Sequence, residues 1–290
     1  MRRFEEAGIA PQTRHGQNFL IDLNLLDLLV RAADIGPSDV ILEVGTGLGS
    51  LTTRLAALAA AVITVEIDPR LHQLASEELT GAANVTLLNQ DALRTKNTIS
   101  PAVLEAVREQ LARRPGSRFK LAANLPYNVA TPILSNLLAA DPLPASMTAT
   151  IQKELADRIL AHPGTKDYSA LSVWMQATSD VEIVRVMSPQ VFWPRPKVQS
   201  AIVHIVTNPA KRSRIAHVEF FHTFVRSLFL HRRKLLRVVL AINLREQLDK
   251  PAIDALLANQ GIAAAARAEE LPVEKLIELA EAVHQHKPEA

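Results

Sequence analysis

The 290-residue sequence predicts an α/β protein, with a doubly wound parallel sheet in the first two-thirds and an all-helical part after it. Two observations favour this fold class. Short apolar and β-branched runs alternate with helix-like segments up to about residue 207, and only helix-like segments follow Asn208 and Pro209. The residues are 48% hydrophobic and 21% charged, which is typical of a globular chain and excludes a largely disordered one.

The expected strands are short runs rich in valine, isoleucine and leucine. They cover residues 40–44, 62–65, 85–88, 119–123, 147–151, 181–186 and 200–206. The expected helices between them cover residues 51–60, 69–79, 101–114, 132–139 and 168–177. Pro69 and Pro101 fit the first turn of their helices, and Ser100 fits a helix cap. Because strands that alternate with helices are joined by crossovers, the pattern predicts a parallel sheet.

Four helices are expected after the change of pattern, over residues 217–230, 232–240, 251–259 and 273–286. In the first of them Phe221, Phe224, Val225 and Leu228 recur at helical spacing, so these side chains are expected in a core. We place a boundary near residues 208–215. The expected domains are therefore residues 1–210 and residues 211–290.

The composition excludes several kinds of site. Because the chain has no cysteine, disulfides, thiolate metal sites and a cysteine nucleophile are excluded, and a reducing cytoplasm fits. The longest apolar stretch, residues 55–65, is too short to span a bilayer, and no apolar segment follows the charged first residues, so no secretory signal is expected. The nine histidines lack metal-ligand spacing, so no metal is expected.

The net charge of +2 hides an uneven distribution. Residues 211–245 hold nine Lys or Arg and one acid, whereas residues 246–290 hold four Lys or Arg and nine acids. Such a basic segment predicts a site for an anionic polymer. Four cations lie around the start of one expected helix. They are Arg232, Arg233, Lys234 and Arg237. A single run of this kind is often only a solvated face, but the surrounding charge favours nucleic-acid binding.

A glycine-rich loop between the first expected strand and helix predicts a cofactor site. Gly45, Gly47 and Gly49 alternate with other residues there, and glycine lets the backbone approach a ligand closely. Glu66 ends the second strand and Asp91 the third, where an acid can bind ribose hydroxyls or an adenine amine. Dinucleotides and S-adenosylmethionine both fit this arrangement. The glycine spacing, with Glu43 two residues before it, favours S-adenosylmethionine.

The segment from Asn124 to Tyr127 follows the fourth expected strand and suits chemistry on an adenine amine. The lone pair of that amine is delocalised into the ring, so the amine is a poor nucleophile. The Asn124 side-chain oxygen and the Leu125 carbonyl can accept its two N–H bonds and help to localise the lone pair. Pro126 fixes the turn, and the Tyr127 ring can stack on a flipped base. The alternative is a simple turn after a strand.

A second aromatic segment, residues 192–197, holds two prolines that favour an extended chain. Phe192 could close the adenine from the face opposite Tyr127, and Arg195 and Lys197 suit phosphates. The alternative for Phe192 is packing under a proline-rich loop.

Together these motifs resemble the ribosomal small-subunit RNA adenine dimethyltransferase family over nearly the whole chain. The motifs are His15-Gly-Gln-Asn-Phe-Leu20, the glycine loop from Glu43 to Thr52, residues 65–69, Asp91-Ala92, Asn124-Leu-Pro-Tyr-Asn128, residues 152–154, residues 168–171, residues 192–200 and residues 232–234.

The resemblance implies a Rossmann-like catalytic domain with a small C-terminal helical, RNA-binding domain. It implies transfer of methyl groups from S-adenosylmethionine to N6 of two adjacent adenosines near the 3′ end of small-subunit rRNA. The partner would be that rRNA within a 30S ribosomal precursor in the cytoplasm, with a monomeric enzyme. By motif match, the donor-binding residues would be Asn18, Leu20, Gly45, Gly47, Glu66, Ile67, Asp91, Ala92 and Asn124.

The sequence departs from the family in three places. The stretch between Asp91 and Asn124 looks longer by about one helix, residues 101–114, which we expect on the surface. Thr46 stands where the family often has proline, and the part after Arg237 is less recognisable.

Two other functions stay open from the sequence. Related enzymes methylate adenine in large-subunit rRNA or in DNA, although the C-terminal domain and residues 192–197 argue against DNA. A ribosome-assembly factor that binds an immature subunit is the non-enzymatic alternative, which the donor loop disfavours.

Overall fold

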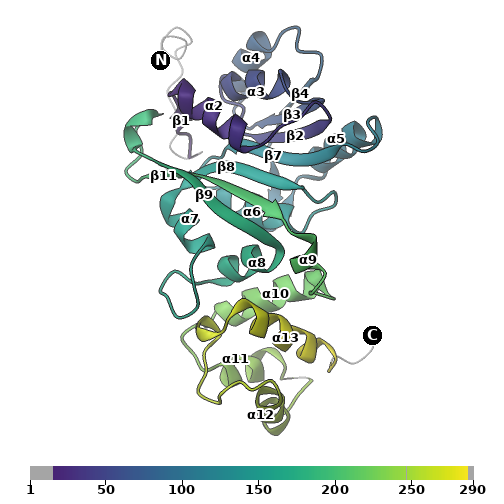
Figure 1. Cartoon of the computed structure of the whole chain (residues 1–290), viewed down its shortest axis with the longest axis vertical. Helices are drawn as coiled ribbons and strands as arrows, with labels where there is room; N and C mark the ends of the chain where they lie inside the picture. The colour runs from purple at the N-terminus through teal and green to yellow at the C-terminus, as the bar shows by residue number, and fades with distance from the viewer. Residues whose placement is uncertain (1–15, 246, 287–290) are drawn as a thin grey trace. The chain divides into compact units, whose positions relative to one another are not determined.

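The computed structural model describes residues 16–245 and 247–286 (Figure 1). They fall into two compact units. The first consists of the chain up to residue 156 together with residues 182–207, and the second of residues 157–181 together with the chain from residue 208. His15, the start of the first motif, lies outside the described residues. None of the helices in the described ranges is long and apolar enough to cross a membrane.

A seven-stranded sheet forms the centre of the first unit, with β4 at one edge and β9 at the other (Figure 1). In spatial order the strands are β4 (Val85–Asn89), β3 (Ala61–Glu66), β2 (Asp39–Val44), β7 (Arg118–Asn124), β8 (Ser146–Gln152), β11 (Ser200–Thr207) and β9 (Ser179–Met187). The first five pair in parallel, as the alternation predicts, and β11 adds to β8 in the antiparallel direction. The Rossmann-like α/β class is thereby confirmed for this unit.

Helices and short hairpin strands complete the first unit. The helices are α2 (Leu23–Ala32), α3 (Ser50–Ala56), α4 (Pro69–Glu78), α5 (Pro101–Ala112), α6 (Ala130–Leu137), α7 (Lys153–Ile159), which runs on into the second unit, and the short 3-10 turn η2 (Pro189–Val191). Two small ladders lie outside the main sheet. They pair β1 (Phe19–Leu20) with β10 (Phe192–Trp193) and β5 (Leu93–Thr95) with β6 (Thr98–Ile99).

The helix expected on the surface at residues 101–114 is present as α5, and most of its side chains are exposed or partly exposed. α5 packs against β2 and β3, and its Val103 and Val107 are fully buried. The physical reason is topological. β4 and β7 both run parallel to the strands between them, so the chain must cross one face of the sheet to return, and α5 is that crossover.

The second unit is helical apart from the first residues of β9. Its helices are α8 (Ala170–Thr178), α9 (Pro209–Arg212), α10 (Val218–Phe229), α11 (Leu236–Asn243), α12 (Lys250–Asn259), η3 (Ala268–Glu270) and α13 (Val273–His284). α10 packs against α8 and α13 and buries the four side chains expected in its core. Because α8 packs on α10, residues 157–181 group with the C-terminal helices. The domain division at residue 210 differs from this partition and stays a prediction.

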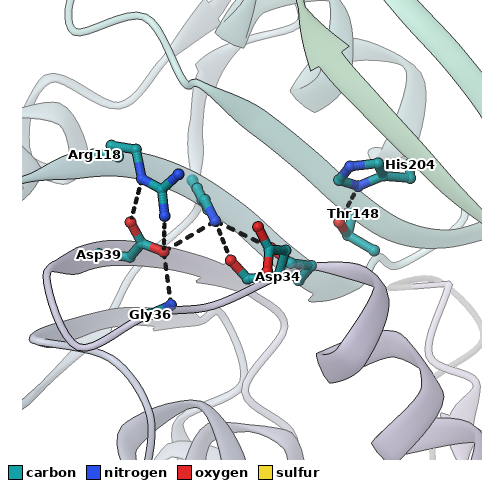
Figure 2. A network of polar contacts seen from close by, with 8 residues as sticks. Asp34, Gly36, Asp39, Arg118, Thr148 and His204 are labelled. Carbon is teal, nitrogen blue, oxygen red and sulfur yellow. Dashed lines mark hydrogen bonds and ion pairs between the residues drawn. The ribbon is translucent and has the colours of Figure 1, made fainter.

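A buried polar cluster closes the amino-terminal ends of β2 and β7 (Figure 2). The Asp39 carboxylate is fully buried and accepts hydrogen bonds from Gly36 N–H (2.8 Å) and Arg118 Nε (2.9 Å), with Lys120 Nζ at 2.9 Å. Lys120 also donates to the Asp34 carbonyl oxygen. Burial by itself would raise the pKa of Asp39, but Gly36, Lys120 and Arg118 together hold it below its ordinary value. The cluster therefore ties the turn before β2 to the central strand β7.

We expect Lys120→Met to destabilise the protein by about 3–5 kcal/mol, because it leaves a buried carboxylate without its buried counter-charge. Urea unfolding would measure the loss. Arg118→Met is the matched control, and it should cost less because water can reach the half-exposed position of the guanidinium. Equal losses for the two variants would contradict this account of the cluster.

Candidate functional site

A cavity opens at the carboxyl ends of β2, β3, β4 and β7, where ligands bind in sheets of this kind. Its lining residues come from five separate segments of the sequence. They are Gln17, Asn18, Phe19, Val44, Gly45, Gly47, Val65, Glu66, Ile67, Leu71, Gln90, Asp91, Ala92, Asn124, Pro126, Asn128 and Val129. Eight of the nine residues proposed for the methyl donor are among them. Their assignment to the donor itself stays a prediction.

The exception is Leu20. Its side chain is only 8% exposed, and it lines a second cavity beside the first together with Glu43 and Leu26. Gly45, Gly47 and Asn124 line both cavities, so the two adjoin along the glycine loop.

The sequence reasoning missed Gln17, Phe19 and Gln90 as residues of the first cavity. Gln17 and Phe19 belong to the first matched motif and Gln90 directly precedes Asp91-Ala92, and that placement is the signal that could have found them. Gln90 is notable because its Nε2 is buried and has no partner within the described part of the chain. It is a hydrogen-bond donor in the wall of the cavity.

Glu66 ends β3 and is 4% exposed. Its Oε2 accepts the Gly47 N–H at 2.9 Å and its Oε1 accepts the Asp68 N–H at 3.0 Å. Burial raises the pKa of this carboxyl above its ordinary value, although the same N–H groups lower it in part. These bonds hold the carboxyl still at the wall of the cavity, and each oxygen keeps a lone pair for a ribose hydroxyl.

Asp91 is exposed at the mouth of the cavity. Its Oδ1 accepts the Leu93 N–H at 2.8 Å, which fixes the side chain, and no described residue bonds its Oδ2. An anchored carboxylate with one oxygen left over suits an adenine amine, which donates hydrogen bonds. The donor set of Glu66, Asp91 and the glycine loop thus fits an adenosine-containing cofactor such as S-adenosylmethionine.

Glu43 is fully buried beneath the glycine loop and is not a solvent-exposed ligand. Its Oε2 accepts the hydroxyls of Thr52 and Thr64, each at 2.6 Å, while its Oε1 has no partner among residues 16–245 and 247–286. Burial raises the pKa of this carboxyl to about 8, although the hydrogen bonds from the two threonine hydroxyls lower it in part. Without a ligand, Glu43 is therefore mostly protonated at neutral pH.

Asn124 is the last residue of β7, and its amide is oriented by one bond. Nδ2 donates to the Asn18 carbonyl oxygen at 2.9 Å, whereas Oδ1 is buried and has no partner in the part of the chain that the structure describes. The amide therefore turns its acceptor, rather than its donors, to an unfilled position beside both cavities. That orientation is the one required to accept an amine N–H.

The loop after Asn124 continues this geometry. Leu125 is buried and donates its N–H to the Thr150 carbonyl at 3.2 Å, and no hydrogen bond to its own carbonyl is present among the described residues. Pro126 lies against the glycine loop, because a Cβ on Gly45 would come within 3.2 Å of the proline Cδ. Tyr127 is half-buried and lies outside the lining of the first cavity, with its hydroxyl 2.5 Å from Ser200 Oγ.

Residues 16–20 join the motifs to one another. A Cβ on Gly16 would come within 2.6 Å of Asn128 Oδ1, and a Cβ on Gly47 would come within 3.2 Å of the Phe19 ring, so this ring packs over the glycine loop. β1 then pairs with β10, so that Phe19 stacks on Trp193 with ring centroids 6.4 Å apart. The first motif thus contacts three segments. They are the glycine loop, the loop after β7 and residues 192–193.

Phe192 does not reach the cavity in this structure. It is 2% exposed and packs in a core cluster with Leu20, Leu26 and Ile41. Its pairing with Leu20 turns the ring inward, and the ring would have to leave this position to contact an adenine. Its stacking role stays a prediction, while the placement matches the alternative of an aromatic packed under the proline-rich loop.

The six cations predicted to bind RNA differ in their surroundings. Arg195 and Lys197 in the first unit, and Arg233 and Lys234 in the second, are exposed and form no ion pair with any described residue. Arg232 instead pairs with Glu269 at 3.2 Å and donates to the Lys166 carbonyl, and Arg237 pairs with Asp254 at 2.7 Å. Within residues 232–237, Arg232 and Arg237 are therefore tethered by ion pairs, whereas Arg233 and Lys234 are untethered.

Comparison with known proteins adds an independent finding. The chain matches the family described as ribosomal RNA adenine dimethylase over residues 10–285. Ribosomal RNA small subunit methyltransferase A of Bacillus cytotoxicus is 37% identical over 284 residues, which cover 98% of this chain and 94% of that protein.

Two solved structures are similar over 92% of this chain. A dimethyladenosine transferase from Plasmodium falciparum superposes with a TM-score of 0.74 over 98% of its own chain, at 24% identity, and shows the same fold. The 23S rRNA methyltransferase ErmE has a TM-score of 0.62 and 26% identity, and the match covers 100% of its chain.

We expect Gly45→Ala to weaken binding of S-adenosylmethionine by at least about tenfold, which corresponds to roughly 1.4 kcal/mol. The alanine would have to adopt a φ of +90° and would press its Cβ against Pro126. Calorimetric titration would measure the affinity. Gly81→Ala is the control, because it carries the same backbone strain (φ +89°) but has nothing within 4 Å of its Cβ. A comparable loss in the control would refute a local effect.

From the raised pKa of Glu43 we predict that the stability of the protein without ligand depends on pH. Because the folded pKa of about 8 lies above the ordinary value of 4.5, the folded protein retains a proton that the unfolded chain loses, and stability falls as pH rises through this window. We expect Glu43→Gln to unfold at nearly the same temperature as the wild type at pH 5 and at a temperature several degrees higher at pH 9. Exposed Glu105→Gln should show no such divergence, and parallel curves for Glu43→Gln would rule the effect out.

Proposed function

This chain belongs to the ribosomal RNA adenine dimethylase family, and on that premise we propose that it dimethylates N6 of two adjacent adenosines near the 3′ end of small-subunit rRNA. The methyl donor of the family is S-adenosylmethionine, and the cavity of this chain fits it. The wider biological setting is part of the same proposal. The rRNA would be bound within a 30S precursor, in the cytoplasm, by a monomeric enzyme.

The observation that carries the proposal is the orientation of Asn124. Its amide nitrogen is held by the Asn18 carbonyl, so the partnerless oxygen lies beside the cavity that fits the donor. An exocyclic adenine amine carries two N–H groups, and the Asn124 oxygen and the Leu125 carbonyl are two acceptors on consecutive residues. Accepting both bonds helps to localise the nitrogen lone pair toward the reacting methyl.

When bound, S-adenosylmethionine supplies a sulfonium methyl, which is a strong electrophile. The residues of this chain therefore need only orient the amine. A strong general base is not required, because methylation makes the amine nitrogen cationic and acidic, and its proton then passes to solvent. Tyr127 cannot act as one, because burial raises the pKa of its hydroxyl above the ordinary value. A base with one methyl still offers one N–H to Asn124, whereas a base with two methyls offers none, which limits the reaction to two transfers.

Binding of the rRNA backbone would use the exposed, untethered cations. Arg195 and Lys197 supply such charges beside β10, and Arg233 and Lys234 supply them before α11. We assign a smaller share to Arg232 and Arg237, because each is already held by an acid. Phosphate contacts of this kind give affinity without sequence specificity.

A second candidate is methylation of large-subunit rRNA, favoured by the structural similarity to ErmE over the whole of that chain. The two proposals share the chemistry and differ in the RNA. Incubation of the protein with labelled donor and undermodified 30S or 50S subunits, followed by digestion to nucleosides, separates them. We expect N6,N6-dimethyladenosine from 30S subunits, and product from 50S subunits alone would favour the second candidate.

We expect Asn124→Ala to reduce dimethyladenosine formation by at least about 100-fold, as for the loss of one group that stabilises the transition state. The fold should persist, since the side chain lies at the end of a strand. Asn136→Ala is the matched control, because this buried asparagine bonds the Lys96 carbonyl outside the cavity. If Asn124→Ala still binds subunits and supports their assembly like the wild type, binding is the main role of the protein.

The cations make a separate prediction for the affinity for 30S subunits. Substituting Arg233 and Lys234 together by alanine should lower the slope of log affinity against log salt by about 0.7–0.9 for each phosphate that the protein no longer neutralises. Arg237→Ala should change the slope less, because its guanidinium is already paired with Asp254. Equal effects of the two variants would show that the ion pairs do not decide which cations bind RNA.

A further inference from the structure

The hydroxyls of Tyr127 and Ser200 form a hydrogen bond that the proposed methyl transfer does not use. The two oxygens are 2.5 Å apart, a short bond between side chains that are 73 positions apart in the sequence. Ser200 is fully buried and is the first residue of β11. Tyr127 is half-buried and comes three residues after Asn124.

The sheet register explains why the two residues meet. β8 lies between β7 and β11. On one side Asn124 pairs with Thr150, whose carbonyl also accepts the Leu125 N–H, and on the other side Ser200 pairs with Gln152. The carboxyl end of β8 therefore lies between the start of the loop that carries Tyr127 and the start of β11. The bond between the two hydroxyls joins that loop to β11 across the carboxyl end of β8.

The same bond also ties the loop after β7 to the start of β11. Ser200 directly follows the segment that holds Arg195 and Lys197, and the Gln199 carbonyl accepts the Lys153 N–H at 2.9 Å. Ser200 is thus fixed by the strand ladder on one side and by this bond next to it. Tyr127 is attached through its hydroxyl to a rigid position of the sheet, while its backbone belongs to a loop.

The chemistry of the pair limits what it can do. Burial raises the pKa of the Tyr127 hydroxyl, and its bond to Ser200 lowers it only in part, so both groups stay protonated at neutral pH. Neither can take a proton from the amine. A hydrogen bond at the tip of a tyrosine instead restricts rotation of the side chain, and stacking on a base depends on the plane and offset of the ring.

We propose that Ser200 is a positioning residue, which holds the ring of Tyr127 in the plane needed to stack on the flipped target adenine. This inference rests on the proposed function, because it requires an adenine above the loop after β7. Ser200 itself does not touch the base. It acts through Tyr127 and does not line the cavity that fits the donor.

The test is a double-mutant cycle on the rate of dimethyladenosine formation with saturating donor and 30S subunits. Ser200→Ala and Tyr127→Phe each remove the same hydrogen bond, so each should lower kcat by about three- to tenfold. The double variant should be no slower than the slower single variant, because the bond can be removed only once. Affinity for S-adenosylmethionine should be unchanged in all three.

Two further variants distinguish positioning from a structural role. Ser200→Thr retains the hydroxyl and should recover most of the wild-type kcat. Ser146→Ala removes another buried serine hydroxyl, at the opposite end of the neighbouring strand β8, and should leave kcat unchanged. If Ser200→Ala proves unstable, Tyr127→Phe still breaks the bond from its other side while Ser200 stays in place.

Multiplicative losses in the double variant, or an unchanged kcat in Tyr127→Phe, would overturn the inference. Such results would leave the proposed function intact, since the wild type would still produce dimethyladenosine. Failure of the wild type to modify either ribosomal subunit would instead remove the proposed function, and with it the adenine that Tyr127 is inferred to stack on.

Discussion

The hydrogen bond from Asn124 Nδ2 to the Asn18 carbonyl is the interaction on which the site depends. A primary amide can present either donors or an acceptor to a ligand, and its two ends are nearly the same size. Anchoring the nitrogen leaves only the oxygen for an incoming group. The backbone that supplies this anchor is itself held by Phe19 over Gly47 and by the pairing of β1 with β10. The preference for an amine that we propose for Asn124 thus originates in a peptide carbonyl more than 100 residues away in the sequence.

The parallel sheet brings these segments together because the carboxyl ends of all its parallel strands lie on the same side of the sheet. Four groups each follow or end a different strand and therefore line the same cavity. They are the glycine loop, Glu66, Asp91 and Asn124. The amino-terminal ends of these strands have another role. There Asp39, Arg118 and Lys120 join β2 to β7 and to the preceding turn, which keeps the two central strands in register. Binding groups and structural charges are therefore separated along the same strands.

The three acids near the site differ in their surroundings. Glu43 and Glu66 are both removed from water, and burial raises the pKa of each, but their hydrogen-bond partners differ. Glu66 receives backbone N–H groups that keep its position fixed beside the cavity, whereas Glu43 receives threonine hydroxyls beneath the loop. Asp91 stays exposed, anchored through one oxygen. Three acids from neighbouring strands thus have three environments that their spacing in the sequence does not reveal.

The sequence by itself determined the order of strands and helices, the parallel sheet and the motifs that line the cavity, because each depends on local periodicity, on glycine at the turn after the first strand or on a few adjacent residues. Tertiary structure decided the rest. Residues 101–114 look like an insertion, yet the strand order shows that α5 is the crossover between β4 and β7, with Val103 and Val107 buried against the sheet. Phe192 lies in the core and Leu20 beside the second cavity, because β1 pairs with β10. The orientation of the Asn124 amide and the tethering of Arg232 and Arg237 depend on partners distant in sequence, and such partners are defined only once the chain has folded.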